Sequence, residues 1–254
     1  MNNVLKFPFI LPVLCFCMFS CRQLSPGPDD NARITGTGGV ILAGKYVPPA
    51  SPDKLTFILL HGLGSGKGEW YSFVDKLTQQ GYGYLLYDLR GHADSTKDKS
   101  GNTVDYKYFL QAGPGSEWEK MVPDLNCAVK YLVKKGINKN KIALMGASLG
   151  ANVSLLYAVK NKTIPLVVLL SPGWSYAGLN IDTAIKEYGD RPLLIAASPG
   201  DKYAYDSSIA MVQYARMNKT KVEFLYGDGA KHGVQMFDGK FEPKLLSWIN
   251  GNCR

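Results

Sequence analysis

Apolar and polar residues alternate along the chain in two rhythms, one typical of buried strands and one typical of amphipathic helices. Short, mainly apolar segments have the length and composition of strands, and the continuous apolar run at 55–60 is typical of a strand buried on both faces. They lie at 55–60, 84–87, 142–145, 166–170, 193–197 and 222–226, and two further β segments lie at 34–37 and 40–46. Between them the pattern predicts helices. These span 70–80, 118–135, 149–160, 207–217 and 245–249. The alternation predicts an α/β fold with a mainly parallel central sheet and helices on both faces.

The clearest helical pattern spans residues 118–135. Its apolar stripe keeps the i, i+3, i+4 spacing of one helix face. The stripe consists of Trp118, Met121, Val122, Leu125, Val129 and Leu132. Nothing in the sequence between residues 34 and 254 marks a domain boundary, and that length suits one α/β domain.

The first 21 residues differ in kind from the rest. Lys6 supplies a positive charge, and residues 7–19 are almost wholly apolar apart from two prolines. This run is too short to span a bilayer as a helix, but it suits the core of a signal peptide. Ser20 and Cys21 follow, so the segment resembles a bacterial lipoprotein signal, in which a small residue precedes a cysteine that becomes lipidated. The resemblance implies an exported protein, anchored to a bacterial membrane through Cys21 on the periplasmic or cell-surface side.

Two alternatives remain open for this segment. It could be an ordinary cleaved signal peptide, in which Cys21 is incidental, or an uncleaved anchor. Residues 22–33 lack an apolar period and contain several turn-forming residues, which predicts a flexible tether. The chain is therefore divided into a signal peptide at 1–21, a tether at 22–33 and one domain at 34–254.

The formal net charge of +8 favours contact with anionic surfaces such as lipid head groups. The lysines are scattered along the sequence, and no basic run is interleaved with aromatic residues as in a nucleic-acid groove. We therefore expect a membrane as a partner, through the N-terminal lipid, and no nucleic acid. The sequence does not indicate an oligomeric state.

One motif carries the main chemical prediction. Gly146-Ala147-Ser148-Leu149-Gly150 directly follows a predicted strand and directly precedes a predicted helix, so it fits G-x-S-x-G in its strand–turn–helix setting. Such a turn holds the serine in a strained, exposed conformation, and the flanking positions must be Gly because a side chain would collide with neighbouring backbone. The alternative is a plain strand-to-helix loop with Ser148 as the N-cap.

With this motif, residues 34–250 resemble the α/β-hydrolase family. In that family a nucleophilic serine is followed along the chain by an acid and then a histidine. His232, just after the last predicted strand, matches the general base. Asp201, four residues beyond the strand that ends at Ala197, matches the acid that orients the histidine. Asp206 is the other candidate, although its place before Ser207-Ser208 is typical of a helix N-cap.

Two further segments resemble the family. His61-Gly62-Leu63-Gly64 is similar to the oxyanion loop, which implies that the amides of Leu63 and Leu149 stabilise the oxyanion and that His61 is structural. Residues 88–95 are similar to the D-x-R-G-x-G-x-S turn, with Ala93 in place of the second glycine. There we expect Asp88 and Arg90 to pair with each other as scaffold.

A nucleotide site is not expected in the glycine-rich stretch 62–68. A phosphate-binding loop needs Ser or Thr after Lys67, and the sequence has Gly68 there. No metal or organic cofactor is expected either, since acyl transfer by a serine, a histidine and an acid requires none.

The substrate class is left open by the sequence. The segment between the strands at 166–170 and 193–197 is too short for a large cap, which favours an open site and the hydrolysis of a small or surface-presented carboxylic ester. Trp174 and Tyr176 are the expected pocket residues. The resemblance leaves thioesterase and peptidase activity open, and an exported binding protein that kept the scaffold without catalysis is the rival from another class.

Two cysteines, Cys127 and Cys253, remain outside the N-terminal segment, without the CxxC spacing of a zinc site. The family resemblance implies that their helices cover opposite faces of the sheet. A disulfide between them would have to cross the sheet, so both thiols are expected to be free.

Overall fold

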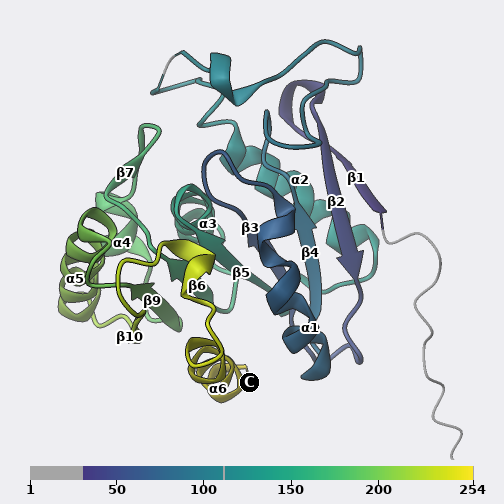
Figure 1. The fold of residues 1–254 in the computed structure, drawn as a ribbon. Helices are drawn as coiled ribbons and strands as arrows, with labels where there is room; N and C mark the ends of the chain where they lie inside the picture. Colours follow the sequence, from purple (N-terminus) through teal and green to yellow (C-terminus); the bar gives the residue numbers. More distant parts are fainter. Residues whose placement is uncertain (1–30, 111, 254) are drawn as a thin grey trace, which may run out of the picture.

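The computed structural model describes residues 31–110 and 112–253, so the predicted signal peptide with Cys21, and most of the predicted tether, lie outside the described residues (Figure 1). Eight strands form one sheet in the order β1-β2-β4-β3-β5-β6-β9-β10. They are β1 (Asn31–Thr35), β2 (Ile41–Val47), β3 (Thr56–Leu60), β4 (Gly83–Tyr87), β5 (Ile142–Ala147), β6 (Val167–Leu170), β9 (Leu193–Ala197) and β10 (Val222–Tyr226). From β4 to β10 neighbouring strands are parallel, while β1–β2 and β2–β4 are antiparallel.

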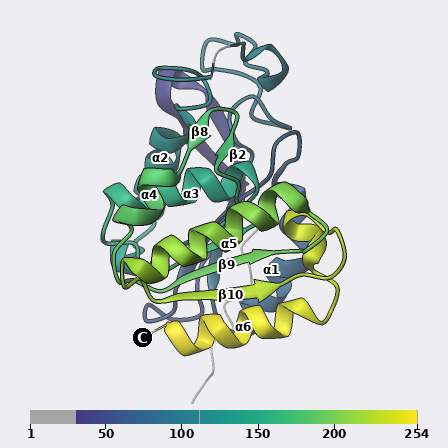
Figure 2. The ribbon, with the colours of Figure 1, turned by 90° about the vertical axis from the view of Figure 1, so that its left-hand side faces the viewer.

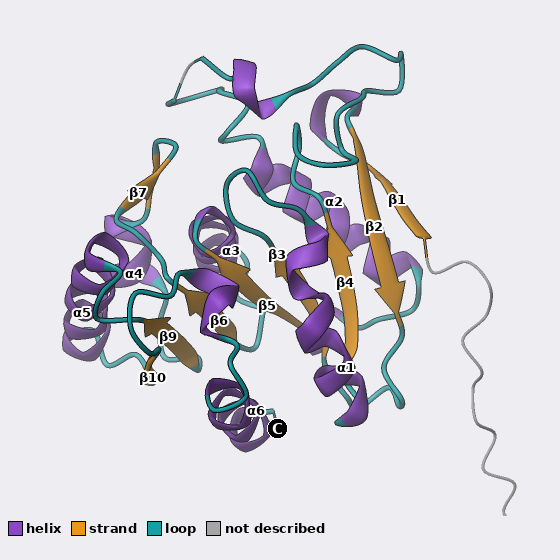
Figure 3. Ribbon diagram, in the orientation of Figure 1, coloured by secondary structure: helices purple, strands orange, loops and turns teal. Residues whose placement is uncertain are grey.

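Helices cover both faces of this sheet (Figure 3). They are α1 (Tyr71–Gln79), α2 (Met121–Lys134), α3 (Leu149–Lys160), α4 (Asp182–Glu187), α5 (Lys202–Met217) and α6 (Phe241–Asn252). One core cluster joins α2, α3, α4 and α5 to the sheet, and the other joins α1 and α6. Figure 2 shows α5 and α6 on opposite sides of β9 and β10. This is the predicted α/β-hydrolase architecture.

The buried strands divide their side chains between the two clusters because successive residues of a strand point to opposite faces. In β3, Ile58 and Leu60 belong to the cluster with α2, whereas Phe57 and Leu59 belong to the cluster with α6. Cys127 packs against the first cluster and Cys253 against the second, and both thiols are free, as predicted.

Element boundaries differ from the predictions in several places. Strand β1 begins at Asn31, so residues 31–33 of the predicted tether pair with β2. The helix predicted at 118–135 begins at Met121, and Trp118 is buried just before it. The segment 171–192 contains a small hairpin, β7 (Ser175–Tyr176) and β8 (Leu179–Asn180), followed by α4.

Helix α5 begins at Lys202, five residues earlier than predicted. The N-cap position therefore belongs to Asp201, and Asp206 lies within the helix with an exposed side chain. The N-cap interpretation of Asp206 is wrong because the turn at Pro199-Gly200 leads directly into the helix.

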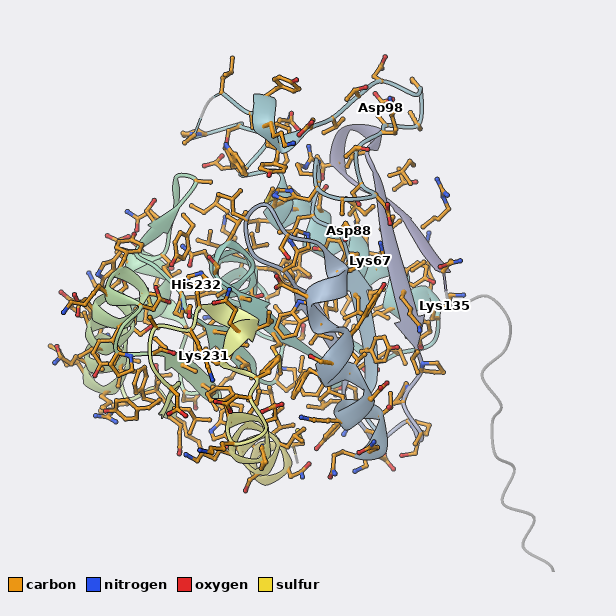
Figure 4. The ribbon with its side chains drawn as sticks, in the orientation of Figure 1. Lys67, Asp88, Asp98, Lys135, Lys231 and His232 are labelled. Atoms are coloured by element: carbon orange, nitrogen blue, oxygen red, sulfur yellow. The ribbon has the colours of Figure 1, made fainter. Side chains whose placement is uncertain are left out.

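The expected pairing of Asp88 with Arg90 is also wrong. Asp88 binds Lys67 instead, with 2.7 Å between Nζ and Oδ2 (Figure 4). The buried Arg90 guanidinium forms a bidentate pair with Asp124 of α2, at 2.7 Å from Nε and 2.9 Å from an Nη atom, and also contacts Glu117. Asp124 accepts a further hydrogen bond from the Thr37 amide. The pair thus ties the turn after β4 to α2 and to the β1–β2 connection.

Replacing one partner of this pair should destabilise the fold strongly. Asp124→Ala would leave the Arg90 charge buried without its bidentate partner, a change that typically costs roughly 3–5 kcal/mol of unfolding free energy. Urea denaturation followed by circular dichroism measures the effect. Asp75→Ala, which removes an exposed carboxylate from α1, is the matched control and should change stability by less than about 1 kcal/mol. Equal stabilities of the two variants would contradict a structural role for the pair.

Candidate active site

Ser148 stands at a sharp turn between β5 and α3, in a backbone conformation that few non-glycine residues adopt (φ 52°, ψ −119°). The flanking glycines have no room for a side chain. A Cβ on Gly146 would lie 2.2 Å from the Gly150 carbonyl oxygen, and one on Gly150 would lie 2.3 Å from the Leu60 carbonyl oxygen. The close packing of α3 against the ends of β3 and β5 therefore requires both glycines, and the turn has the geometry of a nucleophile elbow.

The sheet brings the other predicted site residues to the same place. Parallel register aligns the carboxyl ends of β5, β6, β9 and β10. Ser148 follows β5 directly, Asp201 lies four residues after β9, and His232 lies six residues after β10. Ligands of open α/β sheets bind at this edge, outside the carboxyl ends of the strands.

His232 and Asp201 are joined by a short hydrogen bond, 2.6 Å between Nδ1 and Oδ2. The histidine side chain is 38% exposed and the aspartate side chain 16%. Because the carboxylate accepts from Nδ1–H, it fixes the tautomer of the neutral imidazole and leaves Nε2 able to accept a proton. Asp206, the competing acid, lies in α5 and makes no described contact with His232.

The predicted oxyanion loop lies against Ser148. The Cβ position of Gly62 is 3.5 Å from Cβ of Ser148, and Leu63 comes next with a half-exposed side chain. Leu149 follows Ser148 as the first residue of α3. The backbone amides of Leu63 and Leu149 thus belong to the two segments that flank the serine hydroxyl.

Glu69 supports this loop, although no motif in the sequence points to it. One of its carboxylate oxygens accepts a hydrogen bond from the Gly62 amide at 3.1 Å, and the side chain also interacts with Ser65. Burial raises the pKa of Glu69 above its ordinary value. The contact fixes the loop at the residue before Leu63.

His61 is structural, as the sequence predicted. Its Nε2 accepts a hydrogen bond from the Leu89 amide at 2.8 Å, and its Nδ1 lies 2.7 Å from the Gly62 carbonyl oxygen. The ring is therefore the Nδ1–H tautomer, which donates to Gly62. Burial lowers the pKa of His61 to about 4, so the ring is neutral at physiological pH.

Of the two predicted pocket residues, Tyr176 lies at the site and Trp174 does not contact it. The Tyr176 hydroxyl interacts with the Ser148 side chain, and its ring stands perpendicular to His232 with 6.3 Å between centroids. Burial, followed by the charge of Asp201, raises the pKa of Tyr176, so the hydroxyl stays protonated. Trp174 instead packs edge-on against Tyr214 of α5.

Two polar residues that the sequence did not single out hold these parts in place. The Ser171 hydroxyl, just after β6, accepts a hydrogen bond from the Gly233 amide at 2.9 Å and so anchors the His232 loop. The buried Asn152 amide of α3 donates to the carbonyls of Gly173 and Leu179, both at 2.8 Å, and so anchors the β7–β8 hairpin that carries Tyr176. Neither residue belongs to a motif that spacing alone could reveal.

The described residues contain no group of three or more His, Cys, Asp or Glu side chains placed to hold a metal ion. A cavity of about 530 Å³ lies elsewhere, between the 97–117 loop and Arg90, and none of Ser148, Asp201 and His232 lines it.

Comparison with known proteins places this chain in a family. The family model described as "Serine aminopeptidase, S33" matches residues 51–189. The chain is also 34% identical over 112 residues to a Caenorhabditis elegans protein named dipeptidyl peptidase family member 6. That match covers 42% of this chain and 14% of the relative, so the chain spans only a small part of that relative's length.

Solved structures with the same fold include the esterase Pf2001 of Pyrococcus furiosus, at a TM-score of 0.68 and 20% identity over 88% of this chain and 91% of that one. The acylaminoacyl peptidase of Pyrococcus horikoshii superposes with a TM-score of 0.64 at 13% identity, over 88% of this chain and 41% of that one. At such low identities the likeness establishes the fold alone.

The geometry predicts opposite outcomes for the two candidate acids. Asp201→Asn should lower kcat by roughly 10⁴, because an amide cannot hold His232 in the tautomer that accepts a proton at Nε2. Asp206→Asn changes an exposed position inside α5 and should leave kcat within about twofold of the parent. Hydrolysis of p-nitrophenyl acetate measures both. A large loss at Asp206 with little change at Asp201 would contradict the assignment.

Proposed function

This chain belongs to the serine aminopeptidase family of α/β-hydrolases, and on that basis we propose that it is a serine hydrolase that acts through a Ser148–His232–Asp201 triad. The observation that carries the proposal is the meeting of three features at one edge of the sheet. These are a serine on a strained elbow, a histidine that is hydrogen-bonded to an acid, and an amide-bearing loop beside the serine.

The mechanism is acyl transfer. Nε2 of His232 takes the proton from the Ser148 hydroxyl as its oxygen attacks the substrate carbonyl carbon. Asp201 stabilises the resulting imidazolium through the bond to Nδ1 without taking the proton. His232 then returns the proton to the leaving group, whose bond to the carbonyl carbon breaks, and an acyl-enzyme remains on Ser148. Water, activated by His232 in the same way, hydrolyses that ester.

Leu63 and Leu149 supply the backbone N–H groups for the tetrahedral oxyanion. Donors that are already oriented toward the developing charge stabilise the transition state by roughly 3–4 kcal/mol each in other serine hydrolases. The contact of Glu69 with Gly62 keeps the first of these segments in position. The Tyr176 hydroxyl lies beside Ser148 and would contact a bound substrate.

We propose a small carboxylic ester as the substrate. The insertion between β6 and β9 amounts to the β7–β8 hairpin and the six-residue α4, which is too little to enclose a long chain. A peptidase is the second candidate, because the family description and the names of two relatives refer to peptidases. A panel of p-nitrophenyl esters beside aminoacyl p-nitroanilides separates the two, and a thioester in the same panel tests thioesterase activity.

Ser148→Ala should abolish hydrolysis of every substrate in that panel and labelling by a fluorophosphonate probe, because no other hydroxyl occupies the elbow. Its melting temperature should change little, since alanine fills the same space. Ser100→Ala, an exposed serine in the 94–116 loop, is the control and should retain full labelling. Labelling that survives in Ser148→Ala would falsify the nucleophile, whereas no labelling of the parent protein would favour a non-catalytic binding protein on this scaffold.

We further propose that the protein is exported and anchored to the membrane by a lipid on Cys21. The proposal depends on the sequence of residues 1–21 and on the polar residues that follow. Among the described residues, no helix combines the length and the apolar character needed to cross a bilayer. Acyl chains bind a membrane with about 0.8 kcal/mol per buried CH₂, so two or more chains on Cys21 would give stable attachment.

The mass of the mature N-terminal peptide from the native host tests this anchor. We expect a chain that begins at Cys21 and carries acyl groups, and Cys21→Ser should leave the precursor unprocessed or released. An unmodified N-terminus at any residue would overturn the lipoprotein proposal and leave the hydrolase proposal untouched.

A further inference from the structure

The positive charge of this protein is concentrated at one edge of the sheet. Six segments make up this edge. Five of them consist of the last turn of a helix and the loop that leads into the next parallel strand, and the sixth is the loop from β2 into β3. They are 48–55, 76–82, 131–141, 157–166, 184–192 and 214–221. Together they hold 13 Lys or Arg and 3 Asp or Glu, a net charge of +10, while the entire chain carries +8. The rest of the molecule is thus slightly acidic, and we call this set of segments the basic edge.

The lysines at the centre of the basic edge have no carboxylates among their sequence neighbours. Between Asp124 and Asp182 the chain contains seven lysines and no Asp or Glu. Six of them lie at the ends of α2 and α3 and in the following loops, and none is in a described ion pair. They are Lys134, Lys135, Lys139, Lys141, Lys160 and Lys162.

Helix dipoles account for only part of this charge. A cation near a helix C-terminus is favourable, but the negative end of each dipole equals only about half a charge. The last turn of α2 and its loop alone carry four lysines. The excess therefore projects into solvent, where it attracts an extended anionic partner.

Exposed apolar side chains favour a bilayer as that partner. They lie within the same edge, where Met217 at the end of α5 is 78% exposed and Val133 of α2 is 39% exposed.

From this arrangement we propose that the basic edge binds the surface of an anionic phospholipid bilayer. The catalytic edge, at the carboxyl ends of the same strands, then faces away from the lipid. His232 follows the carboxyl end of β10, whereas Lys135 follows the carboxyl end of α2. The inference does not depend on lipidation of Cys21, and it assigns the enzyme a substrate that arrives from the aqueous side rather than a lipid of the membrane to which it is bound.

Co-sedimentation of the full chain with vesicles tests the proposal. Vesicles of equal parts phosphatidylglycerol and phosphatidylcholine should bind the protein more tightly than pure phosphatidylcholine, and high salt should abolish the difference. Lys134→Gln/Lys135→Gln/Lys139→Gln should weaken binding to the anionic vesicles by roughly tenfold to a hundredfold. Lys97→Gln/Lys99→Gln/Lys107→Gln removes the same charge from the 94–116 loop at the catalytic edge, and it should bind as the parent does.

Equal losses in the two triple variants, or binding that ignores head-group charge, would overturn the proposal. So would tighter binding to a short DNA duplex than to anionic vesicles, with the same variant weakening it. A water-soluble ester should be hydrolysed equally fast by bound and free enzyme, and inhibition on anionic vesicles would show that the catalytic edge faces the lipid. A protein that binds as expected but hydrolyses nothing would contradict the proposed function and not the surface.

Discussion

Close packing of α3 against the ends of β3 and β5 is the constraint on which the rest of the site depends. The helix approaches so closely that neither Gly146 nor Gly150 can carry a side chain. The same approach forces Ser148 into its strained conformation and brings the first turn of α3 beside the loop that contains Gly62. The strain is compensated by burial, since nearly every residue of α3 lies in the core.

Polar contacts hold the surrounding loops to the turn that carries Ser148. Ser171 fixes the His232 loop, Asn152 fixes the hairpin of Tyr176, and Glu69 fixes the loop before Leu63. Each is a contact between elements distant in sequence, and each satisfies a backbone group that would otherwise lack a partner near the site. Preorganisation of this kind is what electrostatic stabilisation of an oxyanion requires, because donors that must reorient contribute less.

The two edges of the sheet differ in charge and in chemistry, and both differences follow from the same topology. In a parallel sheet every strand ends at one edge, where the candidate triad gathers, and every covering helix ends at the other, where lysines favourable to the helix dipoles accumulate. In such an arrangement the basic edge and the edge that holds the candidate triad lie at opposite ends of the strands.

The sequence by itself determined the fold class, the eight strands of the main sheet and the elbow, because each depends on local patterning or on a local steric need. It also placed Asp201 and His232 at strand ends, which a parallel sheet must bring together. It could not determine that Arg90 pairs with Asp124, that Asp206 lies inside α5, or that Ser171, Asn152 and Glu69 support the site. Nor could it show that lysines scattered along the chain share one edge. Those outcomes depend on which residues meet across the sheet, and that is decided by tertiary packing rather than by any local pattern.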